Sequence, residues 1–389
     1  AGMEEEAAKT SLLPAILWRN SVDTAKIFCV NGDYLADISA VGILDAMMGE
    51  TYDYDIYPVI NAQNLVIADL PAFVSENEEE MQKRYSQSAQ AVYQEIVWPS
   101  LTSIASRTGA KMTCMMTPQF TYTDEEEPDG ENVTYYLKRL KEEHAEAGLS
   151  ADSREGIPLS ENIKQDQTFW QTYAPSYRFL SLYADGVKSI GEESALPAEI
   201  RTVALGSGAS GQAVGYLNEN VTLQPSTSSG IRHTFLDDFK VKCMETALGY
   251  SNITLDFYSV TYPEGDEDSW EKMSKKIAAN LGTYWKAYEA FDATTLTESD
   301  VRIRRFLALD YKQQRAGNVI TLSLEHREDA AWFLLRLHGE KVTEVAGGIF
   351  EEIEDGVYLI LAEEDEVSVE VQTGETWQYQ DGGKRGDGT

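Results

Sequence analysis

The chain has 389 residues, of which 42% are hydrophobic, and its 65 acidic residues outnumber 32 basic ones to give a formal net charge of -33. Such a charge repels polyanions, which excludes nucleic acid as a partner and an anionic membrane surface as a docking site. No run of about 18 apolar residues occurs, so the sequence predicts no transmembrane segment. An acidic surface also serves solubility, so neutral and cationic partners remain open.

The first expected element is a strand at Ile27–Val30 that runs into the polar stretch Asn31–Asp37. A short apolar run that ends in a polar turn is typical of a buried strand with function at its carboxyl end. In β/α proteins these ends meet at one rim. Asp33, Tyr34 and Asp37 are therefore candidates to line a cleft.

Helical and strand patterns then alternate as far as about residue 316. Helices are expected over 38–48, 77–108, 131–147, 163–173 and 270–288, and strands over 56–60, 65–68, 111–117, 179–185, 200–205 and 253–258. This alternation predicts parallel βα units in an α/β fold, closed into a distorted (β/α) barrel or nearly so.

Beyond Gly317 the pattern changes to short alternating segments separated by glycine turns. They lie at 319–324, 331–337, 341–345, 356–361 and 366–371, and they predict a small antiparallel β-sandwich. We therefore expect an N-terminal flank (1–20), a barrel (21–316), a sandwich (317–375) and a C-terminal tail (376–389). The polar flanks are typical of a piece cut from a longer protein.

Three aspartates, Asp33, Asp185 and Asp256, follow predicted strands. Two carboxyl groups at a suitable separation are enough for glycoside hydrolysis. Aspartates at strand ends are also common turn and helix-cap residues, so the pattern alone favours the structural role. Tyr183 and Tyr258 adjoin the same ends and are candidates to stack on a sugar.

The sequence predicts no metal site and no cofactor. Its four histidines show no ligand spacing, and His233, next to Arg232 and before two aspartates, is the one that we keep as a candidate ligand-binding residue. Gly206–Gly211 formally matches the GxGxxG pattern, but no helix of sufficient length follows, so we interpret it as a flexible loop. The three cysteines have no local partner, which indicates buried thiols.

Several segments resemble the polysaccharide-deacetylase-like proteins that are encoded with Pel-type exopolysaccharide genes in Gram-positive bacteria. They are Phe28–Leu35, Ile56–Leu65, Glu146–Ser150, Thr254–Val260 with Ser269-Trp270, and Val357–Ile360. The resemblance extends over roughly residues 27–371. It implies a distorted barrel of the carbohydrate-deacetylase type with an appended β-sandwich, working at the cell envelope.

Active members of that superfamily hold a divalent metal with an early Asp and two His, and use a late His as acid. The resemblance places Asp33 at the early Asp. Where the family pattern has a His, this chain has Ser150, with Arg154 four residues on, and the late motif is matched only by Asp256–Ser259. Serine and arginine cannot replace two imidazoles on zinc, so the resemblance implies the scaffold without the reaction.

The leading hypothesis is a catalytically degenerate deacetylase-like protein that binds an exopolysaccharide or a partner of its synthesis machinery. The acidic charge favours a cationic amino-sugar polymer. The alternative is an active carbohydrate esterase or glycoside hydrolase that uses Asp33, Asp185 and Asp256, with a divalent metal in that case only. An assembly platform without a ligand is a third hypothesis. We expect an extracellular or cell-envelope location, compatible with a fragment of a membrane-anchored protein.

Overall fold

The computed structural model describes residues 15–373 except 16, 24, 123–126, 151–156, 187–189, 191–195 and 207–211. The chain forms two compact units. The first comprises Ala1–Met47 and Ile60–Arg304, and the second comprises Met48–Val59 and Arg305–Thr389. The second unit therefore draws on two separate stretches of the sequence.

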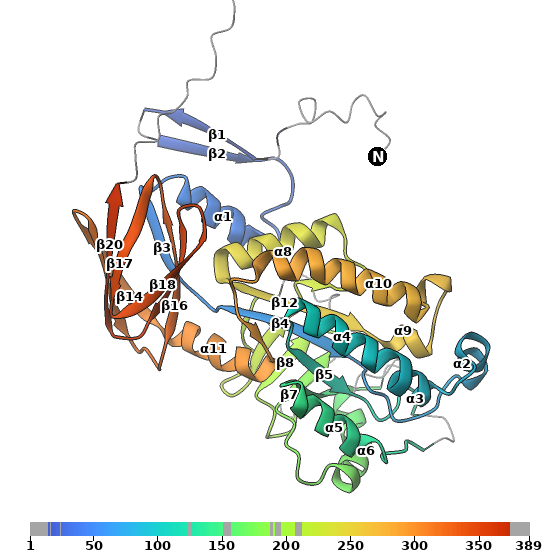
Figure 1. Cartoon of the computed structure of the whole chain (residues 1–389). Helices are drawn as coiled ribbons and strands as arrows, with labels where there is room; N and C mark the ends of the chain where they lie inside the picture. The colour runs from blue at the N-terminus through green and yellow to red at the C-terminus, as the bar shows by residue number, and fades with distance from the viewer. Residues whose placement is uncertain are drawn as a thin grey trace, which may run out of the picture. The chain divides into compact units, whose positions relative to one another are not determined.

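A ten-stranded sheet forms the centre of the first unit, in the order β11-β12-β4-β5-β6-β7-β8-β10-β9 with β13 beside β4 (Figure 1). The strands are β4 (Ala62–Ala68), β5 (Met112–Met116), β6 (Glu146–Ser150), β7 (Ser181–Ala184), β8 (Thr202–Leu205), β9 (Gly215–Tyr216), β10 (Thr222–Pro225), β11 (Ser228–Ser229), β12 (Tyr250–Asp256) and β13 (Ala293–Thr294). All their described pairings are parallel except that of β9 with β10. The predicted parallel β/α architecture is confirmed, as a sheet curled into a half-barrel.

Helices surround this sheet, most of them on its outer side (Figure 1). They are α1 (Ala40–Gly49), α2 (Glu78–Tyr85), α3 (Ala89–Val92), α4 (Trp98–Thr108), α5 (Val133–Glu142), α6 (Leu159–Tyr173), α8 (Phe235–Leu248), α9 (Tyr258–Thr261), α10 (Trp270–Asn280) and α11 (Leu296–Ala308). The long helix expected over 77–108 is divided into α2, α3, a π-helical turn at Tyr93–Val97, and α4. Pro99, the second residue of α4, lies just after the π-helical turn, the point at which the otherwise continuous helix changes its hydrogen-bond pattern. In the described part of the chain, no helix has the length and apolarity to cross a membrane.

Polar side chains fill the curled sheet near the amino ends of its strands. Asn64 on β4 donates to Gln224 on β10 (2.9 Å), and the Thr222 hydroxyl donates to Asp300 on α11 (2.6 Å). Glu146 on β6 accepts the Thr297 backbone N–H at the start of α11 (2.9 Å). Each of these groups has a hydrogen-bond partner, as buried polar groups require. Hydrogen bonds therefore close the half-barrel at the amino ends of its strands.

The apolar run Ile27–Val30 does not open the barrel, which corrects the sequence-based expectation. It belongs to β2 (Ala25–Val30), which pairs in antiparallel fashion with β1 (Leu17–Val22) in a separate two-stranded sheet. Every residue of β1 is exposed. In this hairpin Leu17 lies opposite Val30 and Val22 lies opposite Ala25. The first strand of the parallel sheet is β4.

The second unit consists of two four-stranded antiparallel sheets, β14-β15-β20-β17 and β18-β19-β16-β3. Their strands are β3 (Tyr54–Val59), β14 (Asp310–Ala316), β15 (Val319–Glu325), β16 (Ala331–Leu337), β17 (Glu340–Ala346), β18 (Gly348–Glu354), β19 (Val357–Ala362) and β20 (Glu366–Thr373). Residues of both sheets, such as Leu322 and Phe333, bury one common core, which is the packing of a β-sandwich. The sequence patterns instead place β14 and β3 with the barrel and predict no strand at β18.

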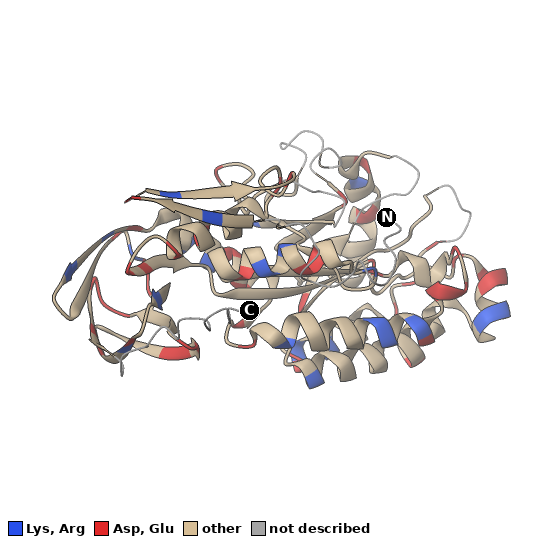
Figure 2. Ribbon diagram, turned by 90° about the horizontal axis from the view of Figure 1, so that it is seen from above, with Lys and Arg blue, Asp and Glu red and all other residues tan. Residues whose placement is uncertain are grey.

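Basic and acidic residues alternate along the helices of the first unit (Figure 2). Several form pairs one helical turn apart, as between Glu271 and Lys275 (2.7 Å) and between Asp238 and Lys242 (2.9 Å). Exposed pairs of this kind contribute only about 0.3–0.5 kcal/mol each. Because acidic residues outnumber basic ones two to one, pairing leaves a large negative excess.

Candidate functional site

The carboxyl ends of the parallel strands meet at one edge of the curled sheet, which we call the rim. Asp69 follows β4, Ser150 ends β6, Asp185 follows β7 and Asp256 ends β12. Parallel pairing places these ends on the same side, the usual position of binding sites in β/α proteins. The rim is therefore the candidate functional site.

Asp69 is the most enclosed carboxylate of the rim. Only 1% of it is exposed, and its φ of 60° lies in the left-handed region, which aspartate tolerates better than most residues. The Ser150 hydroxyl donates a hydrogen bond of 2.6 Å to its Oδ1. This bond ties the end of β6 to the end of β4 across the intervening strand β5.

The Tyr93 hydroxyl lies close to two of these carboxylates. Burial raises the pKa of Tyr93 above its ordinary value, and the charges of Asp69 and Asp256 raise it further, which places the ring within their electrostatic reach. The hydroxyl is fixed by Thr261 (2.8 Å) and donates to the Phe257 carbonyl (3.2 Å). A neutral, immobile phenol is therefore held near both acids.

Glu76 connects three loops at the rim. Its carboxylate accepts the backbone N–H groups of Phe120 (3.0 Å) and Thr121 (3.1 Å), which follow β5, and the Tyr262 hydroxyl (2.6 Å), which follows β12. Tyr262 in turn stacks on Tyr258 with ring centroids 4.8 Å apart. The result is a partly exposed tyrosine pair held in place by a buried acid.

Asp166 on α6 supplies a further buried acid. The Tyr122 hydroxyl donates to both of its carboxylate oxygens (3.1 and 3.0 Å). Burial raises the pKa of Asp166 to about 7, although the hydrogen bond from Tyr122 acts in the opposite direction. Burial also raises the pKa of Tyr122, to which the charges of Asp166 and Asp69 contribute. Asp166 is thus a carboxyl that is partly protonated at neutral pH.

Four of the predicted residues lie at the rim. The Tyr183 hydroxyl donates to Asp185 Oδ1 (3.1 Å), and Asp256 accepts the backbone N–H of Tyr258 (2.9 Å). Tyr183 itself is 2% exposed, so its ring packs inside the sheet and cannot serve as a stacking platform. Asp185, Asp256 and Tyr258 thus lie at strand ends of the sheet, and their roles in binding or catalysis stay predictions.

The structure does not bring Asp33, Tyr34 and Asp37 to the strand ends of the sheet. They follow the β1–β2 hairpin, and the loop packs on α8, where Tyr34 meets Phe239 edge to face (5.6 Å) and Asp37 pairs with Lys240 (3.6 Å). The first strand-end aspartate of the parallel sheet along the chain is Asp69. The signal for it in the sequence is the apolar run Leu65–Ala68, which it directly follows.

His233 follows β11, the edge strand that pairs in parallel with β12. Its Nδ1 is 2.6 Å from the Ser228 hydroxyl and its ring stacks on Tyr284 at 3.4 Å, while burial lowers its pKa. His144 is exposed after α5, and His326 and His338 belong to the second unit. No group of three or more His, Cys, Asp and Glu side chains suited to hold a metal occurs within the described residues.

Some predicted features lie outside the described residues: Arg154, residues 207–211 of the glycine-rich stretch, most of the N-terminal flank and the C-terminal tail. Gly206, the first residue of the expected glycine loop, is described and follows β8. In place of a helix, the chain next forms β9 and β10. This agrees with the interpretation that the glycine pattern is not a nucleotide loop.

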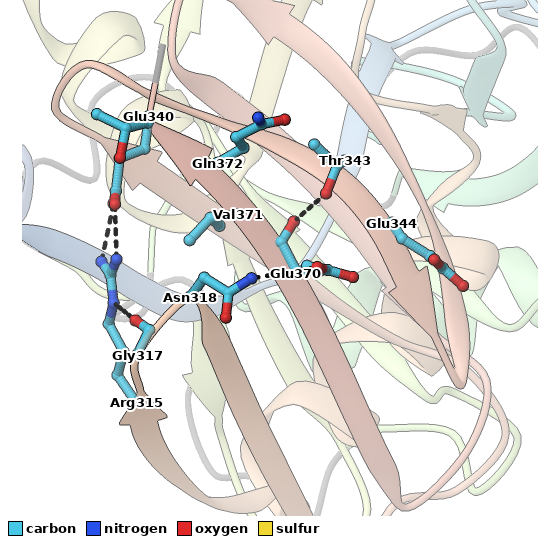
Figure 3. Close-up of a pocket in the computed structure, with 10 residues that line it drawn as sticks. Arg315, Gly317, Asn318, Glu340, Thr343, Glu344, Glu370, Val371 and Gln372 are labelled. Atoms are coloured by element: carbon cyan, nitrogen blue, oxygen red, sulfur yellow. Dashed lines mark hydrogen bonds and ion pairs between the residues drawn. The ribbon is translucent and has the colours of Figure 1, made fainter. Parts of the chain in front are cut away.

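A polar hollow of about 560 Å³ lies on the second unit, and most of its polar groups are already paired (Figure 3). Arg315 binds Glu340 through two hydrogen bonds (2.9 and 2.7 Å), and Asn318 donates to Glu370 (3.1 Å). No aromatic side chain lines it. A ligand there would gain no aromatic stacking surface, whereas the rim offers the partly exposed pair of Tyr258 and Tyr262.

The fold and the rim define an α/β protein with carboxyl groups and tyrosines at the strand ends. A family described as "Uncharacterised protein conserved in bacteria (DUF2194)" matches residues 6–155, less than half of the chain. No curated protein matches the sequence. Among solved structures, a Mycobacterium smegmatis protein assigned by inference as a polysaccharide deacetylase is 8% identical, with a TM-score of 0.36 over 62% of this chain and 90% of its own. A family 39 glycoside hydrolase from Bacteroides cellulosilyticus WH2 is 10% identical, with a TM-score of 0.32 over 87% and 78%.

Proposed function

We propose that this protein is a catalytically degenerate relative of carbohydrate deacetylases whose rim binds an exopolysaccharide. The observation that carries the proposal is the rim itself, where carboxylates and tyrosines surround the ends of β4, β6 and β12. Sugar polymers are recognised by this combination, because tyrosine rings offer apolar faces while carboxylates accept hydrogen bonds from hydroxyl and amino groups. We place the protein at the cell envelope or outside the cell, with proteins of polysaccharide synthesis as further partners.

The donor set around Asp69 supports binding over deacetylation. One of its hydrogen-bond partners is the hydroxyl of Ser150, the position at which the deacetylase pattern has a histidine. Hydroxyl groups are poor ligands for zinc compared with neutral imidazole. The proposal therefore assigns the rim carboxylates to an amino-sugar polymer, whose binding would need no cofactor.

Removing charge from the rim is expected to weaken binding of a glucosamine oligomer roughly tenfold at low salt, because two ion-pairing partners are lost. The variant is Asp185→Asn with Asp256→Asn, measured by calorimetric titration at low and high salt. Glu219→Gln is the control, since this exposed residue lies at the amino side of β10, away from the rim. Equal affinity in all three proteins, or no binding by any, would contradict the proposal.

Glycoside hydrolysis is the second candidate function, favoured by one observation. Asp166 has a pKa raised to about 7, and the charges of Asp166 and Asp69 both act on Tyr122, so a carboxyl that can donate a proton lies in the same region as a second carboxyl, which is the pairing that this reaction requires. Release of reducing ends from a polysaccharide, lost in Asp166→Asn, would establish it. A divalent metal enters only the esterase version, in which acetate release would depend on added metal.

A further inference from the structure

A second cavity, of about 430 Å³, lies between α6 and the outer face of β6. Leu149 forms part of its wall, and successive strand residues face opposite sides of a sheet, so this cavity and Ser150 lie on opposite faces of β6. The rim cluster around Asp69 therefore does not reach it. Nothing in the proposed rim function uses the residues that line this cavity.

One side of the cavity is aromatic and held rigidly. The rings of Trp170 and Tyr177 each pack on Phe179 with centroids 4.8 Å apart. The Tyr177 hydroxyl accepts the Ala147 backbone N–H (3.2 Å) and donates to the Ala147 carbonyl (3.4 Å). Pairing between β6 and β7 begins only at Leu149, so the backbone groups of Ala147 are free of β7 and bond to Tyr177 instead. The ring is thus fixed while 36% of Tyr177 stays exposed.

The other side is polar and locally neutral. Gln167 and Gln171 lie four residues apart on α6, which puts both exposed amides on one face of the helix beside Trp170. The charged residues of the lining are one lysine, Lys164, and one glutamate, Glu199. In a chain of net charge -33 this neutrality disfavours a strongly cationic ligand.

We infer that this cavity is a second carbohydrate site, which takes an uncharged pyranose unit such as an N-acetylated amino sugar. The apolar C–H face of a pyranose ring suits the aromatic wall, while its hydroxyl and amide groups suit two amides that both donate and accept. Its volume lies in the range of small-molecule sites. The choice of a carbohydrate as the ligand rests on the proposed function, but the residues that line this cavity are not those of the rim. A polymer with mixed acetylation would then contact the rim through its cationic units and this cavity through its acetylated units.

The test is calorimetric titration of the full chain with an N-acetylglucosamine oligomer. Gln167→Ala with Gln171→Ala is expected to lower the affinity about tenfold, since two hydrogen bonds are lost. Gln165→Ala is the matched control, because it changes the same residue type on the exposed surface of the same helix but outside the cavity. The Asp185→Asn, Asp256→Asn variant is expected to keep this binding.

The outcomes separate the two claims. Unchanged binding of the acetylated oligomer in the double glutamine variant overturns the inference, while loss of glucosamine binding in the aspartate variant still supports the rim. If the double glutamine variant loses the acetylated oligomer while the aspartate variant keeps full affinity for glucosamine, the cavity is supported and the rim function is contradicted. No binding of the acetylated oligomer by the parent protein also overturns the inference.

Discussion

Replacing Gly348 by alanine is expected to lower the free energy of unfolding of the second unit by at least about 3 kcal/mol. An added Cβ would lie 2.2 Å from the Leu361 carbonyl oxygen, on the neighbouring strand β19. The atom that it meets belongs to a backbone that is already paired on both sides, with β18 and with β16. No side-chain movement can relieve the contact, so a strand would have to shift.

The position explains why glycine is needed there. Gly347 and Gly348 form the corner where the chain leaves β17 in one sheet and enters β18 in the other. Gly347 has a φ of 81°, and a Cβ on it would lie 2.3 Å from the Glu366 carbonyl. Its own carbonyl accepts the backbone N–H groups of Glu363 (2.9 Å) and Glu364 (3.0 Å). The corner therefore links the sheet that contains β17 to the sheet that contains β18 and β19, through both the chain and these hydrogen bonds.

Gly339→Ala is the matched control for this prediction. Gly339 also has a positive φ, of 75°, but nothing lies within 4 Å of an added Cβ. It should cost only about 1 kcal/mol, from backbone strain alone. Hydrogen exchange measured peptide by peptide reports each unit separately, which matters because a chain of two units need not unfold in one step. Equal protection of β19 in both variants would show that the corner tolerates a side chain.

Local patterns predicted the parallel sheet well because each βα unit carries its own signal. The runs that became β4, β5, β7, β8 and β12 were visible as short apolar segments. Their burial on both faces produces such runs irrespective of what they pair with. The weakness of the same signal is shown by Ile27–Val30, which has the composition of a buried strand and lies in an exposed hairpin.

Pairing between distant segments could not be predicted from these patterns. β3 lies in sequence next to the strands of the first unit, yet it pairs with β16, where Trp332 lies opposite Val59. A strand's composition shows that it will pair but not with which partner. For the same reason the sequence could not show that Ser150 would reach Asp69, since that bond depends on the curl of the sheet across β5.

The buried acids of the site were missed because burial of a single charged residue leaves no mark on a periodic pattern. Asp166 occurs on the same face of α6 as Leu159, Asn162 and Phe169, so a polar residue within an apolar stripe was the available signal. Glu76 gave no such signal, because it lies in a loop and acquires its three partners only through tertiary structure.

Glu245→Gln is expected to stabilise the first unit at alkaline pH and to flatten its dependence of stability on pH. Glu245 lies on α8 with 1% of its surface exposed, and its Oε1 accepts a hydrogen bond from Gln63 Nε2 (3.2 Å). Burial raises its pKa from the ordinary 4.5 to about 8, against the opposing effect of hydrogen bonds from Ser251 and Gln63. At neutral pH the folded protein therefore holds this carboxyl protonated.

The sign follows from proton binding. Between pH 4.5 and about 8 the unfolded chain has released this proton and the folded chain retains it, so raising the pH favours unfolding. The contribution is fully present below pH 4.5 and is lost as the pH approaches 8. The slope cannot exceed about 1.4 kcal/mol per pH unit for one group. We expect Glu245→Gln to be more stable than the parent by about 2 kcal/mol at the upper end of this range, because glutamine has no proton to lose.

Urea unfolding at a series of pH values, followed by hydrogen exchange in β4 and β12, measures this effect. Asp166, with a pKa raised to about 7, contributes a slope of the same sign that should survive in Glu245→Gln. Glu271→Gln is the control, because Glu271 is exposed and paired with Lys275, and burial does not hold its carboxyl protonated. Parallel pH profiles for Glu245→Gln and the parent would mean that Glu245 is ionised in the folded protein, and its carboxylate would then have to be stabilised by groups beyond Gln63 and Ser251.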